Sequence, residues 1–258
     1  MEPIRIPDLK DKVILVTGAS TGIGAAVARA LGEQGARVAV HYNASAAPAG
    51  DVVAAIEAAG GQAAAVQGDL AQRGAAEKVV QATVDRFGGL DALVNNAGSM
   101  VRRTPIVDLT DDLYDELMDL NVRSVVAASR AAIPHLRARG GGAIVNTTSI
   151  AARHGGGPGA VLYAASKGFV STFTRGLAKE YVKDKIRVNA VAPGVIVTPF
   201  HDRYSTEAQL DAMRATIPMA RLGTSEELVG AYLYLLSETL SSYVTGQVIE
   251  VNGGQLMP

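Results

Sequence analysis

The stretch Lys12-Val13-Ile14-Leu15-Val16-Thr17-Gly18-Ala19-Ser20-Thr21-Gly22-Ile23-Gly24 determines the fold of this chain. It begins with a short, β-branched apolar run of the kind that forms a strand buried on both faces. The glycines that follow allow a tight turn, and good helix formers continue from residue 22 to about residue 34. A strand, a glycine turn and a helix in this order predict a unit whose turn binds a phosphate group.

The same alternation of short apolar strands and helices continues along the chain. Further strands are predicted at residues 37–41, 62–67, 92–95, 143–147, 187–191 and 247–251, and further helical segments up to residue 59 and at 75–87, 111–139, 161–183 and 225–237. This pattern predicts one α/β domain over residues 1–258, a doubly wound, Rossmann-like parallel sheet of about seven strands with helices on both faces. Residues 195–223 have weak periodicity and are interpreted as a partly helical flap over the site.

The composition places the chain among ordinary globular proteins. It has 258 residues, of which 48% are hydrophobic and 19% charged, enough to bury a substantial core. A net charge of −1 gives no electrostatic reason to expect nucleic acid or an anionic membrane as partner. Cys is absent, which excludes disulfides and thiolate catalysis. The sequence has no signal peptide and no apolar run long enough to span a bilayer, so we expect a cytoplasmic protein.

Tyr163 and Lys167 form a candidate catalytic pair. They lie four residues apart on the predicted helix 161–183 and therefore share one face of it. A nearby ammonium favours the phenolate, so we expect Lys167 to lower the pKa of Tyr163 from the usual value of about 10. Ser149, at the end of the preceding strand, is placed to hold a substrate oxygen against Tyr163. Taken alone, the pair also fits a solvated surface position.

The chain resembles the short-chain dehydrogenase/reductase family over essentially its whole length. The matching motifs are Thr17-Gly18-x-x-x-Gly22-x-Gly24, Asn95-Asn96-Ala97-Gly98, Ser149 with Tyr163-x-x-x-Lys167, and Pro193-Gly194. Together, in this order and at these strand ends, they are highly specific. The resemblance implies the single-domain Rossmann fold and an NAD(P)-dependent enzyme that moves a hydride between a nicotinamide ring and a carbon bearing oxygen.

The resemblance also implies individual roles. Tyr163 is implied to be the general acid/base, with Ser149 polarising the substrate oxygen. Lys167 is implied to lower the pKa of Tyr163 and to hold the ribose, and Asn121 to support a water-mediated proton relay to Lys167. Asp69 is implied to contact the adenine, although a turn or helix cap is an alternative role for it. The cofactor-binding residues are expected to be Gly18, Ser20, Thr21, Gly22, Ile23, Gly24, Tyr42, Asn43, Asp69, Leu70, Asn95, Ala97, Gly98, Tyr163, Lys167, Pro193, Gly194, Val195, Ile196 and Thr198.

The end of the second predicted strand bears on the choice of cofactor. NAD-preferring sheets of this kind carry an Asp or Glu there, which binds the ribose 2′-hydroxyl. Here the segment reads Val40-His41-Tyr42-Asn43, without a carboxylate, and the usual basic residue for a 2′-phosphate is replaced by Thr21. Polar side chains such as Asn43 and Ser45 can still donate hydrogen bonds to a phosphate. The missing carboxylate favours NADP(H), with NAD(H) as the alternative.

Candidates for the substrate pocket are His154, His201 and Phe200, together with Ser149 and Tyr163. A place at the surface is the alternative for the two histidines. The histidines show no paired spacing and no clustered carboxylates, which argues against a metal site. The expected reaction interconverts a secondary alcohol, such as a sugar or another hydroxy compound, and its ketone. A 3-oxoacyl-[acyl-carrier-protein] reductase is the alternative enzyme, and a non-catalytic dinucleotide-sensing protein is the alternative of another class.

The resemblance further implies a homotetramer. Its contacts are expected from the helices at about 111–139 and 161–183 and from the C-terminal segment that ends at residues 251–254. Apolar residues on those helices fit either an interface or an ordinary core.

Overall fold

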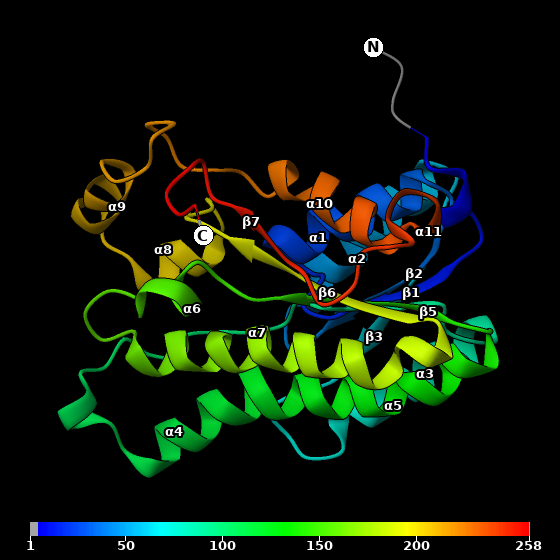
Figure 1. Ribbon diagram of the computed structural model, residues 1–258, viewed down its shortest axis with the longest axis horizontal. Helices are drawn as coiled ribbons and strands as arrows, with labels where there is room; N and C mark the ends of the chain where they lie inside the picture. The colour runs from blue at the N-terminus through cyan, green and yellow to red at the C-terminus, as the bar shows by residue number, and fades with distance from the viewer. Residues whose placement is uncertain (1–4, 258) are drawn as a thin grey trace.

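Strand β1 (Val13–Val16) lies between two apolar layers. Its four side chains are completely buried. Val13 and Leu15 pack into one apolar cluster and Ile14 and Val16 into another, because successive residues of a strand point to opposite faces. In the computed structural model, which describes residues 5–257, a layer of helices covers each face of the sheet (Figure 1).

The sheet has the topology of a doubly wound fold. Within the described residues it contains seven parallel strands in the order β3-β2-β1-β4-β5-β6-β7. The strand order reverses between β1 and β4, and ligands of such sheets bind outside the carboxyl ends of the strands at this point. The predicted fold class is therefore confirmed. The other strands are β2 (Arg37–Tyr42), β3 (Gln62–Gln67), β4 (Ala92–Asn95), β5 (Gly142–Thr147), β6 (Ile186–Pro193) and β7 (Val248–Val251).

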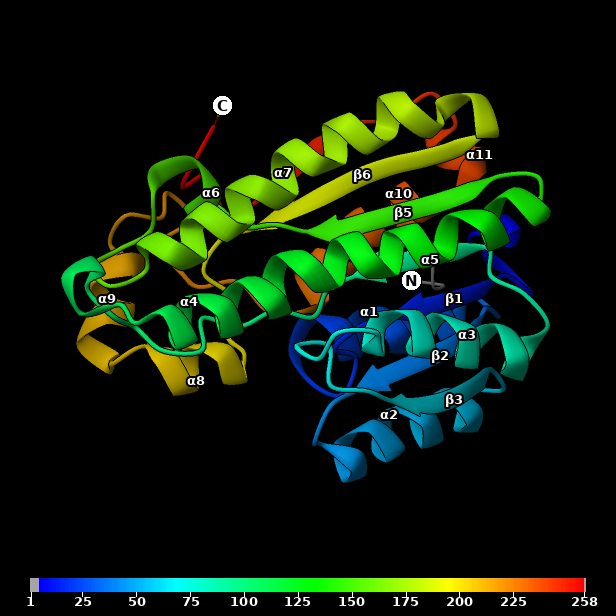
Figure 2. The ribbon, with the colours of Figure 1, turned by 90° about the horizontal axis from the view of Figure 1, so that it is seen from below.

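The helices are divided between the two faces. One face carries α1 (Gly22–Glu33), α2 (Ala46–Ala58), α10 (Glu226–Leu236) and α11 (Glu238–Ser241) (Figure 1). The other carries α3 (Ala75–Phe87), α5 (Ser124–Ala138) and α7 (Val161–Tyr181), with α5 between its two neighbours (Figure 2). The predicted helical region 111–139 consists of α4 (Asp111–Met118) and α5, joined by a π-helical turn, Asp119–Arg123. Short 3₁₀ turns lie at Pro7–Leu9, Ile106–Asp108 and Val182–Asp184.

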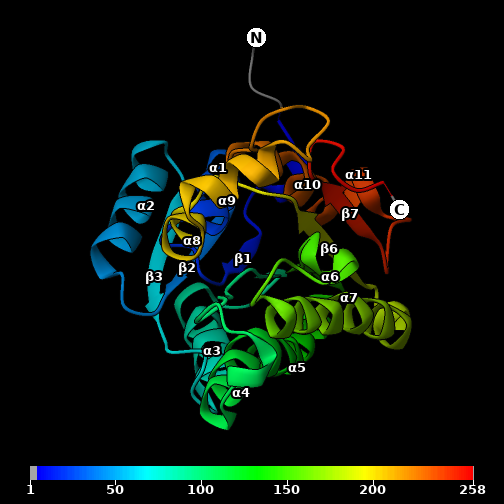
Figure 3. The ribbon, with the colours of Figure 1, turned by 90° about the vertical axis from the view of Figure 1, so that its left-hand side faces the viewer.

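Three short helices lie at the end of the molecule to which the strands point. They are α6 (Ala151–His154), α8 (Pro199–Tyr204) and α9 (Glu207–Arg214) (Figure 3). The helices α8 and α9 belong to the region interpreted as a partly helical flap. The sequence does not predict α6 or α11, because a four-residue helix is too short to show helical periodicity. None of the described helices combines the length and apolar character needed to cross a membrane.

Candidate active site

A cavity of about 680 Å³ lies along the carboxyl ends of the central strands. The glycine turn after β1 lines one part of it, and the segments that follow β4, β5 and β6 line the rest. This volume is in the range that small-molecule and cofactor sites occupy. The predicted site residues that line it are Gly18, Ser20, Thr21, Gly22, Ile23, Asn43, Leu70, Ala97, Gly98, Ser149, His154, Tyr163, Lys167, Pro193, Gly194, Val195, Ile196, Thr198, Phe200 and His201.

Five predicted site residues are not among those that line the cavity. Asn95 is buried in the sheet, where its amide donates to Ser129 Oγ at 3.1 Å and to Asn146 Oδ1 at 2.9 Å. Asp69 accepts the backbone N–H of Ala71 at 3.1 Å, which corresponds to the turn-capping alternative for this residue. The other three are Gly24, Tyr42 and Asn121.

The glycine turn is so tight that two of its positions exclude any side chain. Gly18 has a φ of 62°, and a Cβ atom there would lie 2.9 Å from the Cα atom of Ala97. A Cβ atom on Gly24 would lie 2.3 Å from the carbonyl oxygen of Gly18. Both distances are far below van der Waals contact. The backbone itself therefore forms this wall, as close approach to a phosphate requires.

His41, at the end of β2, holds the turn in place. Its Nδ1 accepts the backbone N–H of Gly18 at 3.0 Å, and its carbonyl oxygen accepts the N–H of Ala19 at 2.8 Å. Its Nε2 lies 3.0 Å from the carbonyl oxygen of Gly68 and donates to it, because the other ring nitrogen is the acceptor. The imidazole is 2% exposed, and burial lowers its pKa. His41 is therefore a neutral side chain whose two nitrogens are both hydrogen-bonded.

The start of α1 completes the fit to a diphosphate. Thr21 is the N-cap residue of α1, and its side chain makes no capping hydrogen bond. The first helical residues, Gly22 and Ile23, line the cavity. The N–H groups in the first turn of a helix have no partner within the helix, and they attract anions. The turn therefore fits the diphosphate of a nicotinamide dinucleotide.

The segment after β4 is tied directly to the glycine turn. Thr17 Oγ1 accepts the backbone N–H groups of Asn96 and Ala97 at 2.9 and 3.0 Å. The amide of Asn96 donates in return to the carbonyl oxygens of Thr17 and Gly18 at 2.9 and 3.1 Å. Of the two neighbouring asparagines, Asn96 lines the cavity and Asn95 does not. The motif at residues 95–98 thus joins the sheet to the glycine turn.

Ser149, Tyr163 and Lys167 meet in another part of the same cavity. Ser149 follows β5, and the other two residues lie one turn apart on α7. The side chains of Ser149 and Tyr163 share a hydrogen bond, and Lys167 Nζ lies 5.9 Å from the centre of the Tyr163 ring. Lys167 is 4% exposed, and its Nζ donates to the carbonyl oxygen of Thr147 at 2.9 Å. The fold therefore brings together the three side chains that the sequence assigns to catalysis.

Burial controls the ionisation of Tyr163 and Lys167. It raises the pKa of Tyr163 to about 12, while the hydrogen bond with Ser149 acts in the opposite direction. It lowers the pKa of Lys167 to about 8. The expected lowering of the pKa of Tyr163 is not found in this arrangement, because loss of hydration raises that pKa by more than the hydrogen bond with Ser149 lowers it. At neutral pH, Tyr163 is a neutral phenol that can donate a proton.

Asn121 lies in the π-helical turn and points into the protein. Its fully buried amide donates to the carbonyl oxygen of Ser99 at 2.8 Å and accepts the N–H of Ser99 at 2.9 Å. It also donates to Ser166 Oγ at 3.1 Å. Asn121 therefore connects the loop after β4 to α7, beside Lys167. The water-mediated relay implied for this residue stays a prediction.

The flap contacts the candidate catalytic residue Tyr163 through an aromatic side chain. The Phe200 ring in α8 lies 5.5 Å from the Tyr163 ring and 5.0 Å from the Tyr204 ring. Tyr204 Oη lies 2.7 Å from Ser99 Oγ, which ties the flap to the loop after β4. Of the two candidate histidines, His201 is part of the flap and is partly buried, and His154 is exposed; both line the cavity.

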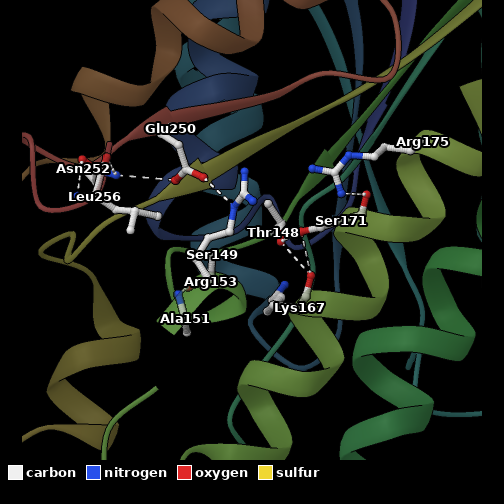
Figure 4. Close-up of polar contacts among 10 residues, drawn as sticks. All are labelled: Thr148, Ser149, Ala151, Arg153, Lys167, Ser171, Arg175, Glu250, Asn252 and Leu256. Carbon is white, nitrogen blue, oxygen red and sulfur yellow. Dashed lines mark hydrogen bonds and ion pairs between the residues drawn. The ribbon is translucent and has the colours of Figure 1, made fainter. Parts of the chain in front are cut away.

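A second group of contacts joins the segment after Ser149 to the C-terminal strand (Figure 4). Ser149 Oγ accepts the N–H of Ala151, at the start of α6, at 3.1 Å. Arg153 of the same helix pairs with Glu250 of β7, with 3.3 Å between Nε and Oε1. The amide of Asn252 donates to the other oxygen of Glu250 at 3.5 Å. The position of α6 therefore depends on β7.

Several residues that line the cavity had no role assigned from the sequence, and three of them make contacts that matter for the site. They are His41, Asn96 and Arg103. Asn96 stands inside a motif that the sequence analysis identified, and the motif was the available signal. His41 and Arg103 carried no local signal, because neither belongs to a spacing pattern.

Known oxidoreductases resemble the chain over nearly its whole length. A family model described as enoyl-(acyl carrier protein) reductase matches residues 18–255. An uncharacterised oxidoreductase of Methylorubrum extorquens is 41% identical over 248 residues, which is 95% of this chain and 98% of that protein. A 3-oxoacyl-[acyl-carrier-protein] reductase of Synechocystis is 39% identical over 249 residues, or 96% of this chain and 98% of that protein.

Solved structures with bound nicotinamide dinucleotides share the fold. The NADH-dependent reductase A1-R′, complexed with NAD, has a TM-score of 0.88 and 41% identity, covering 98% of this chain and 100% of that one. A short-chain dehydrogenase from Burkholderia cenocepacia, in complex with NADP, has a TM-score of 0.89 and 39% identity, covering 96% and 99%. Because these matches span almost the entire length of both partners, the chain belongs to the short-chain dehydrogenase/reductase family of oxidoreductases.

Proposed function

We propose that the protein interconverts a secondary alcohol and the corresponding ketone, with NAD(P) as hydride carrier and Tyr163 as general acid/base. The alcohol is a sugar or another hydroxy compound. One observation carries the proposal: Ser149, Tyr163 and the buried Lys167 line the same cavity as the glycine turn. The same cavity is thus lined by a turn that fits a diphosphate and by a phenol that can protonate an oxygen.

The ionisation of the site favours reduction of the ketone at neutral pH. Tyr163 is protonated there, since burial raises its pKa to about 12, and it donates that proton to the carbonyl oxygen as negative charge develops. Ser149 holds the same oxygen by a hydrogen bond, and the charge on Lys167 stabilises the phenolate that remains. A bound nicotinamide dinucleotide supplies the hydride to the carbonyl carbon. Proton transfer by a positioned group of this kind contributes about 10²–10⁴-fold in rate.

Asn121 acts in this proposal as a positioning residue. Its amide and the ammonium of Lys167 converge on Gly98, where a Cβ atom would lie 3.0 Å from Lys167 Nζ and 3.2 Å from Asn121 Oδ1. Gly98 lines the cavity, and a side chain there would displace both groups. The hydrogen bonds of Asn121 to Ser99 and Ser166 therefore fix the surroundings of Lys167.

NADP(H) is the proposed cofactor, with NAD(H) as the alternative. The cavity lining after β2 includes Asn43 and Ser45 and no carboxylate, so it contains no group that would repel a 2′-phosphate. The nearest acidic side chain, Asp69, lies outside the lining, with 3.4 Å between its Oδ1 and Asn43 Nδ2. Dissociation constants from fluorescence titration test the preference. NADPH is expected to bind at least about tenfold more tightly than NADH, and Asn43→Asp is expected to reverse the order; tighter NADH binding in the wild type overturns the assignment.

The reaction itself is tested with a panel of sugars, secondary alcohols, ketones and acetoacetyl thioesters, followed by the absorbance of reduced nicotinamide. We expect turnover of at least one alcohol or ketone. Tyr163→Phe should lose at least about 10²-fold in kcat and still bind cofactor. Tyr243→Phe is the matched control, because Tyr243 is fully exposed outside the cavity. Equal activity of Tyr163→Phe and wild type contradicts the proposed role.

Two other results would point to the alternatives. Selective turnover of acetoacetyl thioesters supports a 3-oxoacyl-[acyl-carrier-protein] reductase, the activity named for the Synechocystis relative. Cofactor binding without turnover of any compound supports a dinucleotide-sensing protein.

A further inference from the structure

Every charged side chain that lines the cavity is cationic. Within residues 5–257, Arg103, Lys167 and Arg203 are among the residues that line the cavity, and no Asp or Glu is. Lys167 is buried and already bonded to the carbonyl oxygen of Thr147. A cavity walled by cations without a compensating carboxylate favours an anionic ligand.

Arg103 lines the same cavity as Ser149 and Tyr163 and is held by two backbone carbonyl groups. Its Nε donates to the carbonyl oxygen of Tyr204 in α8 at 3.2 Å. Its Nη1 donates to the carbonyl oxygen of Pro158 at 2.8 Å, in the loop that runs from Ser149 to Tyr163. Two backbone carbonyls from separate segments thus fix the plane of the guanidinium. Arg103 is therefore a preorganised cation, not a mobile surface side chain.

The third nitrogen of Arg103 is left for a ligand. Within the described chain, Nη2 has no hydrogen-bond partner, and the guanidinium has no carboxylate within ion-pair distance. The charge of Arg103 also reaches His201, whose pKa is lowered first by burial and then by this charge. Asp202, beside His201, is exposed and lies outside the cavity lining. An anion bound at Arg103 would offset the unpaired positive charge.

We propose that the substrate of the enzyme is an oxo acid, and its product a hydroxy acid, whose carboxylate binds Arg103 while its carbonyl oxygen faces Ser149 and Tyr163. This inference rests on the proposed carbonyl reduction and narrows its substrate class. A carboxylate oxygen can accept a charge-assisted hydrogen bond from the free Nη2 of the guanidinium. A thioester carries no charge near its carbonyl group and would leave Arg103 unpaired.

Substrate pairs that differ only in charge test the proposal. They are 2-oxobutanoate, acetoacetate and 4-oxopentanoate, each compared with its methyl ester, and dihydroxyacetone phosphate as a phosphate probe. For the wild type, at least one acid should exceed its ester about tenfold or more in kcat/KM, mainly through KM. Arg103→Met should reduce that ratio about tenfold, and Arg103→Lys should recover part of it. The ratio is informative even if loss of the contacts to Tyr204 and Pro158 slows both substrates.

Arg102→Met is the matched control, because Arg102 is the exposed neighbour of Arg103 and does not line the cavity. It should keep the wild-type ratio of acid to ester. Equal use of acids and esters, an unchanged ratio in Arg103→Met, or a preference for dihydroxyacetone phosphate overturns the carboxylate assignment.

A binding experiment separates this inference from the proposed function. Thermal shifts of the Tyr163→Phe variant with NADPH are measured in the presence of each acid and each ester. If no probe is reduced by the wild type, carbonyl reduction fails for this class. If an acid stabilises the Tyr163→Phe variant and this effect is lost when Arg103→Met is added to the same variant, the anion site is still supported. If neither the acids nor the esters stabilise the variant, the anion site is overturned.

Discussion

His41 Nδ1 accepts the backbone N–H of Gly18 at 3.0 Å, so that a side chain from the end of β2 braces the turn after β1. The opposite nitrogen of the ring donates to the carbonyl oxygen of Gly68, at the end of β3. Three neighbouring strand ends are thus connected through one imidazole. A protonated ring would present an N–H to the N–H of Gly18, so the arrangement requires the neutral form.

Substitution of His41 should weaken the turn and alter its response to pH. Burial lowers the pKa of His41 in the folded state, so the unfolded chain binds a proton more readily. The stability that the neutral ring contributes is therefore lost as the pH falls below about 6.5. His41→Leu should lose about 1–3 kcal/mol of unfolding free energy at pH 7, because two backbone groups lose partners.

Asn is the informative comparison at position 41, because its amide oxygen can still accept from Gly18. We expect His41→Asn to keep most of the cofactor affinity and to be less sensitive to pH than the wild type between pH 5 and 7. Urea denaturation across this range and titration with NADPH measure both effects. Identical pH dependence in all three proteins would show that His41 does not titrate as argued.

Gly24→Ala should impair cofactor binding as well as stability. The added methyl group would lie 2.3 Å from the carbonyl oxygen of Gly18, so the turn has to move. We expect a loss of about 1–3 kcal/mol in stability and at least about tenfold in NADPH affinity. Gly50→Ala in α2 is the control, since nothing lies within 4 Å of a Cβ atom there. That variant should gain about 0.5–1 kcal/mol and bind cofactor normally, as measured by calorimetry.

The rate of ketone reduction should fall as the pH rises through about 8. Lys167 loses its charge there, since burial lowers its pKa to about 8, whereas Tyr163 stays protonated to about 12. The decline should appear in kcat/KM measured at constant ionic strength. A profile that stays flat to pH 10 would show that the reaction does not need the charge on Lys167.

The same burial predicts a stability effect of opposite sign. The pKa of Lys167 falls from 10.5 to about 8. This shift corresponds to a loss of about 3 kcal/mol in the free energy of unfolding at pH 7, where the buried side chain is charged. Between pH 8 and 10.5 the unfolded chain binds more protons, so the stability of the wild type should rise with pH in this window. Lys167→Met should remove this rise, gain up to about 3 kcal/mol at pH 7 and abolish turnover. Chemical denaturation at pH 7, 9 and 10 provides the measurement.

The homotetramer implied by the family resemblance is tested through α7. Phe169 is 40% exposed and stacks on Phe173, with 5.8 Å between the ring centres. A large aromatic side chain on an exposed helix face suits a subunit contact. Light scattering after size-exclusion chromatography should give four times the chain mass for the wild type, and less for Phe169→Glu. Ala54→Glu, on the exposed side of α2, should leave the mass unchanged.

The parts of the site that the sequence predicted depend on short spacings. Gly18, Gly22 and Gly24 lie close together in the sequence, where β1 leads into the first residues of α1. Tyr163 and Lys167 lie one helical turn apart on α7. Local geometry brings such residues together in any fold that forms the surrounding elements. The alternation of apolar strands and helices, likewise local, was sufficient to predict the order of layers and the sheet.

The parts that the sequence did not predict depend on distant contacts. Arg103 bonds to residues 55 and 101 positions away, and no spacing rule relates them. The ionisation of Tyr163 was predicted in the wrong direction for a similar reason. The spacing of Tyr163 and Lys167 follows from the sequence, but the loss of hydration that raises the pKa of Tyr163 depends on side chains such as Phe200, which reach the site from another element.

The position of Asn121 depends on the number of residues in the π-helical turn between α4 and α5. Such a turn holds one residue more than an α-helical turn. Deleting one residue from Asp119–Arg123 would rotate α4 by about 100° relative to α5. If the deleted residue lies between Asn121 and α5, Asn121 also turns relative to α5, away from the position in which it bonds Ser99 and Ser166. The extra residue thus sets the rotation between α4 and α5. A deletion there would disable the site, although every catalytic side chain would remain in the sequence.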